Sequence, residues 1–146
     1  MIDSNNPDPS VIALPSGGYL AVATSNYATD KNTEPAFPIY YSDNLIDWEL
    51  QEYVFPPGSW PVWCEQNMWA PEIHHVNGRF LAYFSCAAAN ARHSIGVAVS
   101  QSDSYLGPYQ DLGVPLVYHN EVQGPWGVII GIKRITSCLR RVWLAA

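Results

Sequence analysis

Two carboxyl side chains lie near the heads of two similar stretches of this chain. Asp8 lies in Asp8-Pro9-Ser10-Val11-Ile12, and Glu72 lies in Ala70-Pro71-Glu72-Ile73-His74, about sixty residues later. A carboxylate can take a proton from a reactant, or accept a hydrogen bond from a hydroxyl group. An aspartate before a proline is also ordinary turn chemistry. The residue types alone therefore leave a catalytic and a purely structural interpretation open.

The segments behind the two heads repeat as well. Gly18-Tyr19-Leu20-Ala21-Val22-Ala23-Thr24-Ser25 leads to Pro38-Ile39-Tyr40-Tyr41-Ser42, and Gly78-Arg79-Phe80-Leu81-Ala82-Tyr83-Phe84-Ser85 leads to Ile95-Gly96-Val97-Ala98-Val99-Ser100. A repeat of this length, made of short strands, is typical of a β-propeller in which each unit forms one blade. The first strands of the blades converge on the axis of such an array. Residues at the heads are therefore the first candidates for function.

The pattern predicts an all-β chain with about two four-stranded antiparallel blades. We expect strands near 10–14, 18–25, 37–42 and 47–54 in the first blade, and near 71–76, 79–86, 94–100 and 109–112 in the second. Ser16-Gly17-Gly18 and Asn77-Gly78 suit tight hairpin turns, because glycine accepts a positive φ. The expected blades cover residues 8–55 and 69–112, with the start of a third near 124–129.

The repeat is lost at Ile130, where the head of a third unit is expected. We therefore divide the chain into a partial propeller at 1–129 and an atypical basic tail at 130–146. Apolar residues of the tail recur at helical spacing between basic ones, a pattern that can lie on a membrane surface. Loss of the repeat favours instead a truncated or alternatively read end.

Composition limits the classes of partner. The net charge is −6, and all 13 acidic residues lie at or before Glu121, so the body of the chain lacks the basic face that nucleic acid requires. An acidic, aromatic-rich body suits a neutral ligand rich in hydroxyl groups, such as a carbohydrate. The chain contains no run of about 18 apolar residues, so the sequence does not predict a membrane span. Met1-Ile2-Asp3 does not begin a signal peptide, so the protein stays inside the cell or its leader is absent from this chain.

Neither the cysteines nor the histidines predict a metal site. Cys64, Cys86 and Cys138 lack metal-ligand spacing, and we expect buried free thiols, with one cysteine left over if a bridge forms. His74 and His75 are adjacent in a predicted strand, so their side chains point to opposite faces. We expect no metal and no cofactor.

Several motifs resemble glycoside hydrolase family 43. They are Asn6-Pro7-Asp8-Pro9-Ser10-Val11-Ile12, Pro38-Ile39-Tyr40-Tyr41-Ser42 with Asp47-Trp48, Met68-Trp69-Ala70-Pro71-Glu72-Ile73, Ile95-Gly96-Val97-Ala98-Val99-Ser100 and Leu106-Gly107-Pro108-Tyr109. The likeness runs from about residue 5 to 129. It implies part of a five-bladed β-propeller that acts outside the cell. It also implies hydrolysis of arabinofuranosyl or xylosyl linkages in plant polysaccharides by an inverting mechanism with three acidic residues.

The resemblance assigns roles to residues one by one. Asp8 takes the general-base position, and Ile130 stands where the family has the aspartate that tunes the pKa of the general acid. The general-acid glutamate belongs to a later blade. Trp69 looks like a wall of the sugar pocket, although a core tryptophan is nearly as good an interpretation. Glu72 either contacts sugar or is structural, and it is not one of the three catalytic acids.

Two further hypotheses compete with an active hydrolase. With two of its three acids missing, the chain looks truncated and is expected to be inactive alone. It could then act as a non-catalytic carbohydrate-binding fragment that uses Trp69 as a platform. It could also be a fragment without an independent role, because two blades leave sheet edges open.

Overall fold

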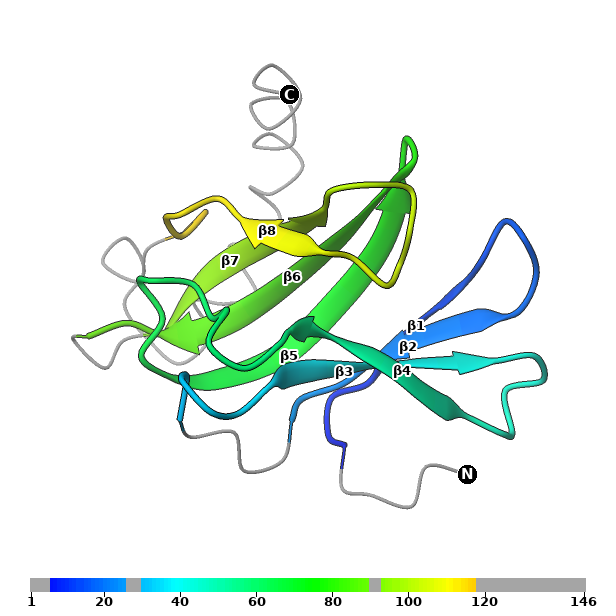
Figure 1. The fold of residues 1–146 in the computed structure, drawn as a ribbon, viewed down its shortest axis with the longest axis horizontal. Coiled ribbons are helices and arrows are strands. Elements are labelled where there is room, and N and C mark those ends of the chain that lie inside the picture. Colours follow the sequence, from blue (N-terminus) through cyan, green and yellow to red (C-terminus); the bar gives the residue numbers. More distant parts are fainter. Residues whose placement is uncertain (1–5, 26–29, 90–92, 118–146) are drawn as a thin grey trace.

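The computed structural model describes residues 6–25, 30–89 and 93–117, and these form two four-stranded antiparallel sheets (Figure 1). The first sheet has the strand order β1-β2-β3-β4 and the second has the order β5-β6-β7-β8. The strands are β1 (Ser10–Ala13), β2 (Tyr19–Val22), β3 (Ala36–Ser42), β4 (Glu49–Phe55), β5 (Gln66–Val76), β6 (Arg79–Ala87), β7 (His93–Ser100) and β8 (Tyr109–Asp111). The predicted fold class, two antiparallel blades formed in chain order, is confirmed.

Most strands lie within three residues of their predicted bounds, and β5 is the exception. It begins at Gln66 rather than near residue 71, so Trp69 lies inside a strand and not in the loop before it. The predicted start of a third blade at 124–129 and the tail at 130–146 lie outside the described residues. The division of the chain at residue 129 therefore stays a prediction.

The Asn77-Gly78 turn between β5 and β6 forms as expected. Both residues have positive φ, 48° and 73°, and they connect the paired residues Val76 and Arg79. Two successive residues with positive φ make the hairpin turn whose twist matches that of the flanking strands. This turn sets the register of the β5–β6 pairing from Val76 back to Glu72.

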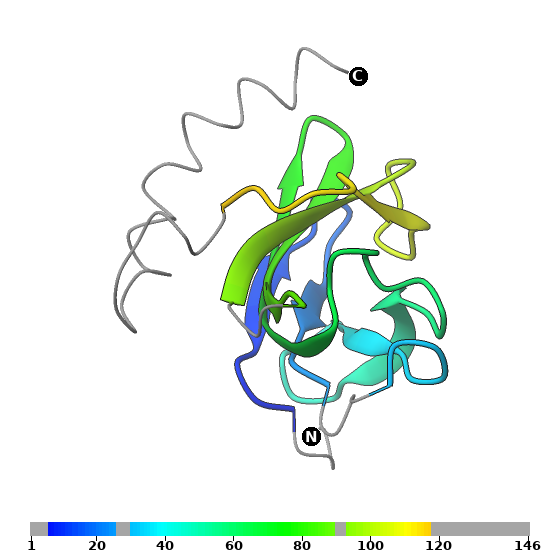
Figure 2. The same ribbon diagram turned by 90° about the vertical axis from the view of Figure 1, so that its left-hand side faces the viewer.

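The two sheets pack on each other through a shared core of aromatic rings. The ring of Phe84 on β6 lies 5.6 Å from that of Phe37 on β3 and 5.2 Å from that of Phe55 on β4. All three side chains are buried. β5 lies alongside β1 and β2, and the two views show the sheets side by side (Figures 1 and 2). The heads of the two sheets are therefore neighbours in space.

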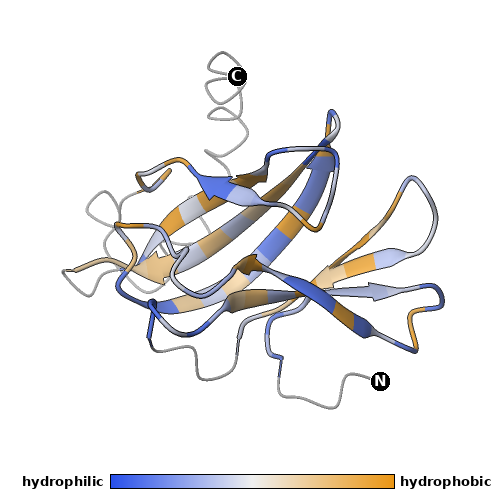
Figure 3. Ribbon diagram, viewed as in Figure 1, coloured by the Kyte–Doolittle hydropathy of each residue, from blue (hydrophilic) through white to orange (hydrophobic). Residues whose placement is uncertain are grey.

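Alternation along β5 separates the two faces of the second sheet. Ile73 is fully buried toward the first sheet, whereas Glu72 and His74 are exposed on the other face. The same alternation shows as bands of polar and apolar residues along the strand (Figure 3). Such period-two patterning is expected when only one face of a strand packs on a core.

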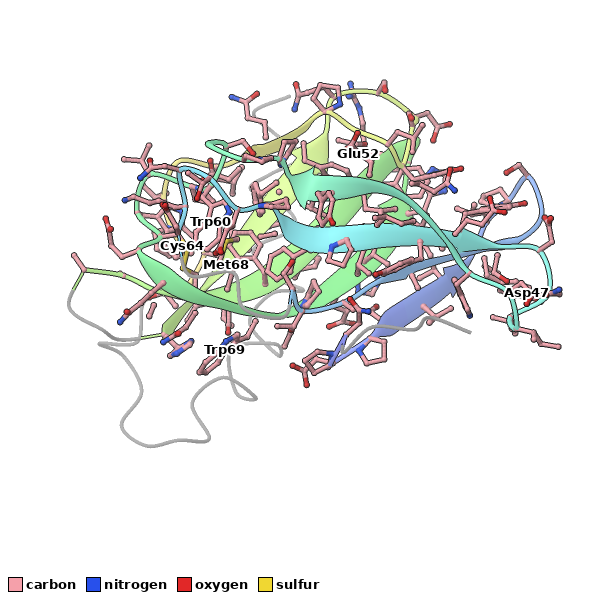
Figure 4. The ribbon with its side chains drawn as sticks, turned by 60° about the horizontal axis from the view of Figure 1, so that its bottom comes forward. Asp47, Glu52, Trp60, Cys64, Met68 and Trp69 are labelled. Atoms are coloured by element: carbon pink, nitrogen blue, oxygen red, sulfur yellow. A yellow bond between two sulfur atoms is a disulfide. The ribbon has the colours of Figure 1, made fainter. Side chains whose placement is uncertain are left out.

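Cys64 and Cys86 form a disulfide bond, so the expectation of free thiols is wrong for these two residues. Their Cα atoms lie 5.8 Å apart, and both side chains are fully buried. The cause is the loop after β4, which returns to the end of β6, where the Glu65 N–H donates to the Ala87 carbonyl at 3.0 Å. Cys64 belongs to the same buried hydrophobic core cluster as Trp60 and Met68 (Figure 4). Cys138 lies outside the described residues.

Among the residues that the structure describes, no helix is long and apolar enough to cross a membrane.

Gly96→Ala should destabilise the fold, because β7 passes close to two core rings at this residue. A Cβ on Gly96 would lie 2.5 Å from Cζ of Phe84 and 2.6 Å from Cζ2 of Trp63. Overpacking of this kind costs about 1–3 kcal/mol of unfolding free energy, which urea denaturation measures. Phe84→Leu replaces the ring with a smaller side chain and makes room for the new methyl group. The Gly96→Ala/Phe84→Leu double variant should therefore lose less unfolding free energy than the sum of the losses of the two single variants. An unchanged urea midpoint for Gly96→Ala would contradict the described packing.

Replacing both Cys64 and Cys86 with alanine should lower the unfolding free energy by about 2–4 kcal/mol, the usual contribution of a disulfide that closes a loop of this size. Urea denaturation of the variant and of the parent chain measures the difference. A reducing agent should destabilise the parent and leave the variant unchanged. Equal stability of the parent with and without reductant would show that the bridge is absent.

Candidate functional site

Asp8 lies just before β1 with an exposed side chain and a positive φ of 54°. Aspartate is among the few residues that tolerate this backbone region. Two hydrogen bonds from Thr24 hold the segment in place. The Thr24 N–H donates to the Pro7 carbonyl at 2.9 Å, and the Thr24 hydroxyl donates to Asp8 Oδ2 at 3.2 Å. The carboxylate is therefore anchored through one oxygen at the head of the first sheet.

Trp69 lies at an irregularity in β5. The pairing of β5 with β6 shifts register between Gln66 and Trp69 and again between Trp69 and Glu72, and Ala70 has a positive φ of 49°. Bulges of this kind redirect a side chain and occur often near functional sites. The Ala70 N–H turns to the first sheet and donates to the Thr24 hydroxyl at 2.8 Å.

The Thr24 hydroxyl therefore connects the heads of the two sheets. It accepts a hydrogen bond from Ala70 and donates one to Asp8, and its residue is only 5% exposed. A second connection between β1 and β5 lies further along both strands, where the Ile73 N–H donates to the Ser10 hydroxyl at 3.2 Å. Asp8 and the backbone that carries Trp69 are thus brought to the same end of the molecule.

Trp69 as a residue is 47% exposed, so the interpretation as a core tryptophan is wrong. Its indole stacks on the imidazole of His93, which begins β7, with ring centroids 4.5 Å apart and planes 25° from parallel. Trp69 lies at the lower edge of the molecule in this view, far from Asp47 (Figure 4). A half-exposed indole can offer its free face to the apolar side of a sugar ring.

Glu72 follows Trp69 on β5, and its carboxylate faces away from the core. Glu72 Oε1 lies 3.0 Å from His74 Nε2. His75 points to the other face of the sheet, where its Nε2 lies 2.7 Å from Asp103 Oδ1, so the prediction that the two histidines diverge is confirmed. In the described part of the chain, no group of three or more histidine, cysteine or acidic side chains is placed to hold a metal ion.

Sequence reasoning missed Thr24, Ser10 and His93. Thr24 follows a strongly apolar strand, and a small polar residue at a strand end is the signal that could have drawn attention to it. Its importance depends on Ala70, which is 46 residues away in the chain. Nothing in the sequence places His93 against Trp69, because the two lie on strands separated by β6.

The fold agrees with the comparisons to known proteins. Residues 1–125 match the model of glycosyl hydrolases family 43. This match covers most of the chain, which therefore belongs to this family of glycosidases.

Individual relatives show how much of the family's length is present. The extracellular endo-alpha-(1->5)-L-arabinanase 1 of Bacillus subtilis (strain 168) is 30% identical over 115 residues, which are 73% of this chain and 33% of that protein. The extracellular exo-alpha-(1->5)-L-arabinofuranosidase ArbA of Cellvibrio japonicus (strain Ueda107) is 29% identical over 94 residues, 57% of this chain and 26% of that protein. The chain thus spans between a quarter and a third of the length of these relatives.

A solved structure gives the same result for the fold. The GH43_1 enzyme from Xanthomonas citri, complexed with xylotriose, superposes with a TM-score of 0.65 at 22% sequence identity. The match covers 79% of this chain and 34% of that enzyme. The two sheets of this chain therefore have the fold of the corresponding part of a family 43 enzyme.

Thr24→Val should lower the unfolding free energy by about 0.5–1.5 kcal/mol, because it removes the acceptor of the part-buried hydrogen bond from the Ala70 N–H. Thr24→Ser keeps a hydroxyl and should retain most of the stability. Urea denaturation measures both, and amide hydrogen exchange of Ala70 should become faster in the valine variant only. Equal Ala70 exchange in the two variants would show that the hydroxyl does not connect the sheets.

Proposed function

We propose that this chain carries the general-base portion of a glycoside hydrolase site that acts on arabinose- or xylose-containing plant polysaccharides by inversion. The observation that supports this most is the hydrogen-bond path from Asp8 through Thr24 to Ala70. This path holds one exposed carboxylate at the same end of the molecule as an exposed indole. A carboxylate beside an aromatic surface suits a ligand that is neutral, rich in hydroxyl groups and apolar on one face.

Asp8 is the proposed general base. Inverting hydrolysis needs a carboxylate that takes a proton from water while the water attacks the anomeric carbon opposite the leaving group. Among the described residues, the hydrogen-bond partner of the Asp8 carboxylate is Thr24, through Oδ2. Oδ1 can then face the attacking water. Within the described residues, this anchoring restricts the carboxylate through Oδ2 alone.

Trp69 and Glu72 are the proposed sugar contacts. The free face of the indole would stack on the C–H face of a pentose, and the Glu72 carboxylate would accept a hydrogen bond from a sugar hydroxyl. Both residues lie on the same stretch of β5, and both are exposed. Glu72 has no proposed part in proton transfer.

The chain alone is expected to bind sugar without hydrolysing it. Inversion also requires a carboxylic acid that protonates the leaving oxygen, about 6.5–9.5 Å from the base. The resemblance places the aspartate that tunes this acid at position 130, which is isoleucine here, and it assigns the acid itself to a later blade. Loss of a general acid typically lowers a rate by about 10²–10⁴-fold.

The test compares binding with turnover. Calorimetric titration of the chain with α-1,5-arabinotriose and with xylotriose should detect binding of at least one of them, and Trp69→Ala should weaken it about tenfold or more, because the stacking surface is removed. Trp48→Ala is the matched control, because Trp48 lies in the connection between β3 and β4, where its indole N–H donates to the Leu45 carbonyl at 3.3 Å. Its neighbour in the sequence, Asp47, lies far from Trp69 (Figure 4). A nitrophenyl arabinofuranoside should show no turnover.

Two results would contradict the proposal. Equal sugar binding by the parent and by Trp69→Ala would show that the Trp69 indole does not form the proposed wall of the sugar site. Turnover at the level of a complete enzyme, abolished by Asp8→Asn, would contradict the expectation that the chain alone is inactive.

A further inference from the structure

We infer that His93 is a positioning residue that holds the Trp69 indole ready for a pentose and leaves one face of it open. The inference rests on the proposed function, because it gives the indole the role of the sugar wall. It adds a residue, on a different strand from Trp69, to which neither the sequence motifs nor the resemblance assigns a role.

The two rings come together from opposite sides of β6. Trp69 on β5 is paired with Ser85 on β6, and Ser85 is paired with Ile95 on β7. His93 lies two residues before Ile95, so its side chain is on the same face of the sheet as those of Trp69 and Ser85. The rings stack at 4.5 Å with planes 25° apart, so the imidazole covers one face of the indole.

Ser85, on the central strand β6, contacts the imidazole of His93. Its hydroxyl lies 3.4 Å from His93 Nδ1, a weak hydrogen bond, and its residue is only 9% exposed. The serine lies on the central strand between the two rings. A serine at this position therefore orients the imidazole without adding bulk beneath the stack.

The strand that carries Trp69 gives the indole little support of its own. The pairing of β5 with β6 is irregular on both sides of Trp69. A large side chain in such a segment loses rotamer freedom when a ligand immobilises it, and that loss reduces affinity. Stacking on His93 restricts the indole before the sugar arrives. It also determines which face is used, because the covered face is closed to the ligand.

The chain offers a matched control for the stack. His75 stacks on Phe80 with ring centroids 4.3 Å apart and planes 25° from parallel, nearly the same geometry. That pair involves the opposite face of the sheet, where Ile73 packs. Truncating His75 removes a comparable histidine–aromatic contact without touching Trp69.

The experiment compares His93→Ala, His93→Phe and His75→Ala in the full chain. Calorimetric titration with α-1,5-arabinotriose and xylotriose should show affinity weakened about three- to tenfold for His93→Ala. Affinity should stay near that of the parent for His93→Phe, which keeps an aromatic ring, and for His75→Ala.

Proton NMR tests the ring stack in the absence of sugar. The Trp69 indole resonances, assigned with Trp69→Phe, should move in His93→Ala and stay in His75→Ala, because only His93 lies over the indole.

The outcomes separate this inference from the proposed function. If Trp69→Ala loses binding and His93→Ala does not, His93 has no positioning role and the proposed function stands. If His93→Phe binds as weakly as His93→Ala, the stack is not what matters, and the inference is wrong. If the parent chain and Trp69→Ala bind equally, or if the parent binds neither sugar, both the proposed function and the positioning role of His93 are wrong. Unmoved indole resonances in His93→Ala would show that the rings do not stack in solution.

Discussion

Each sheet of this protein has an apolar face that it cannot bury alone, and the packing of these two faces determines the rest of the structure. Phe84 from the second sheet lies against Phe37 and Phe55 from the first. Once these rings interlock, the relative position of β1 and β5 is set, and the heads of both sheets come together. The hydrogen bonds at the heads add to an arrangement that burial of these apolar faces stabilises.

The heads themselves are unfavourable segments of backbone. Asp8 and Ala70 both have a positive φ, and for alanine this region costs about 1–2 kcal/mol relative to the right-handed one. Thr24 contacts both residues from a buried position and offsets part of this cost with two hydrogen bonds. Strain that the surroundings hold in place is common where a protein presents groups to a ligand. The proposed function gives a reason for strain at these two points.

The sequence predicted those features that depend on near neighbours. Alternating residues and the Asn77-Gly78 turn are local signals, and they identified the strands and the antiparallel pairing within each sheet. The early start of β5 was missed because Gln66 to Ala70 do not alternate, since two register shifts interrupt that stretch. The Cys64–Cys86 bond was missed because a loop conformation, and no spacing, brings these residues together.

The candidate site was predictable only in part. Asp8, Trp69 and Glu72 stand in motifs, so they could be named from the sequence, and their roles stay predictions. Thr24 and His93 acquire meaning only through partners on another strand, 46 and 24 residues away. Contacts between two sheets, or between strands of one sheet that are not adjacent, leave no periodic trace in a single sequence.

The disulfide bond between Cys64 and Cys86 also limits the cellular compartments in which this fold keeps its full stability. Disulfides persist in oxidising compartments and are rare in the cytosol, where glutathione and thioredoxin keep sulfurs reduced. In a reducing compartment the loop before β5 would depend on weaker ties, such as the exposed pair of Lys31 and Glu65 at 2.8 Å. Trp63, on the same loop, stacks on Phe84 with ring centroids 5.8 Å apart. Reduction of the disulfide would therefore loosen this stack and, through the loop, the start of β5, the strand that presents the indole of Trp69.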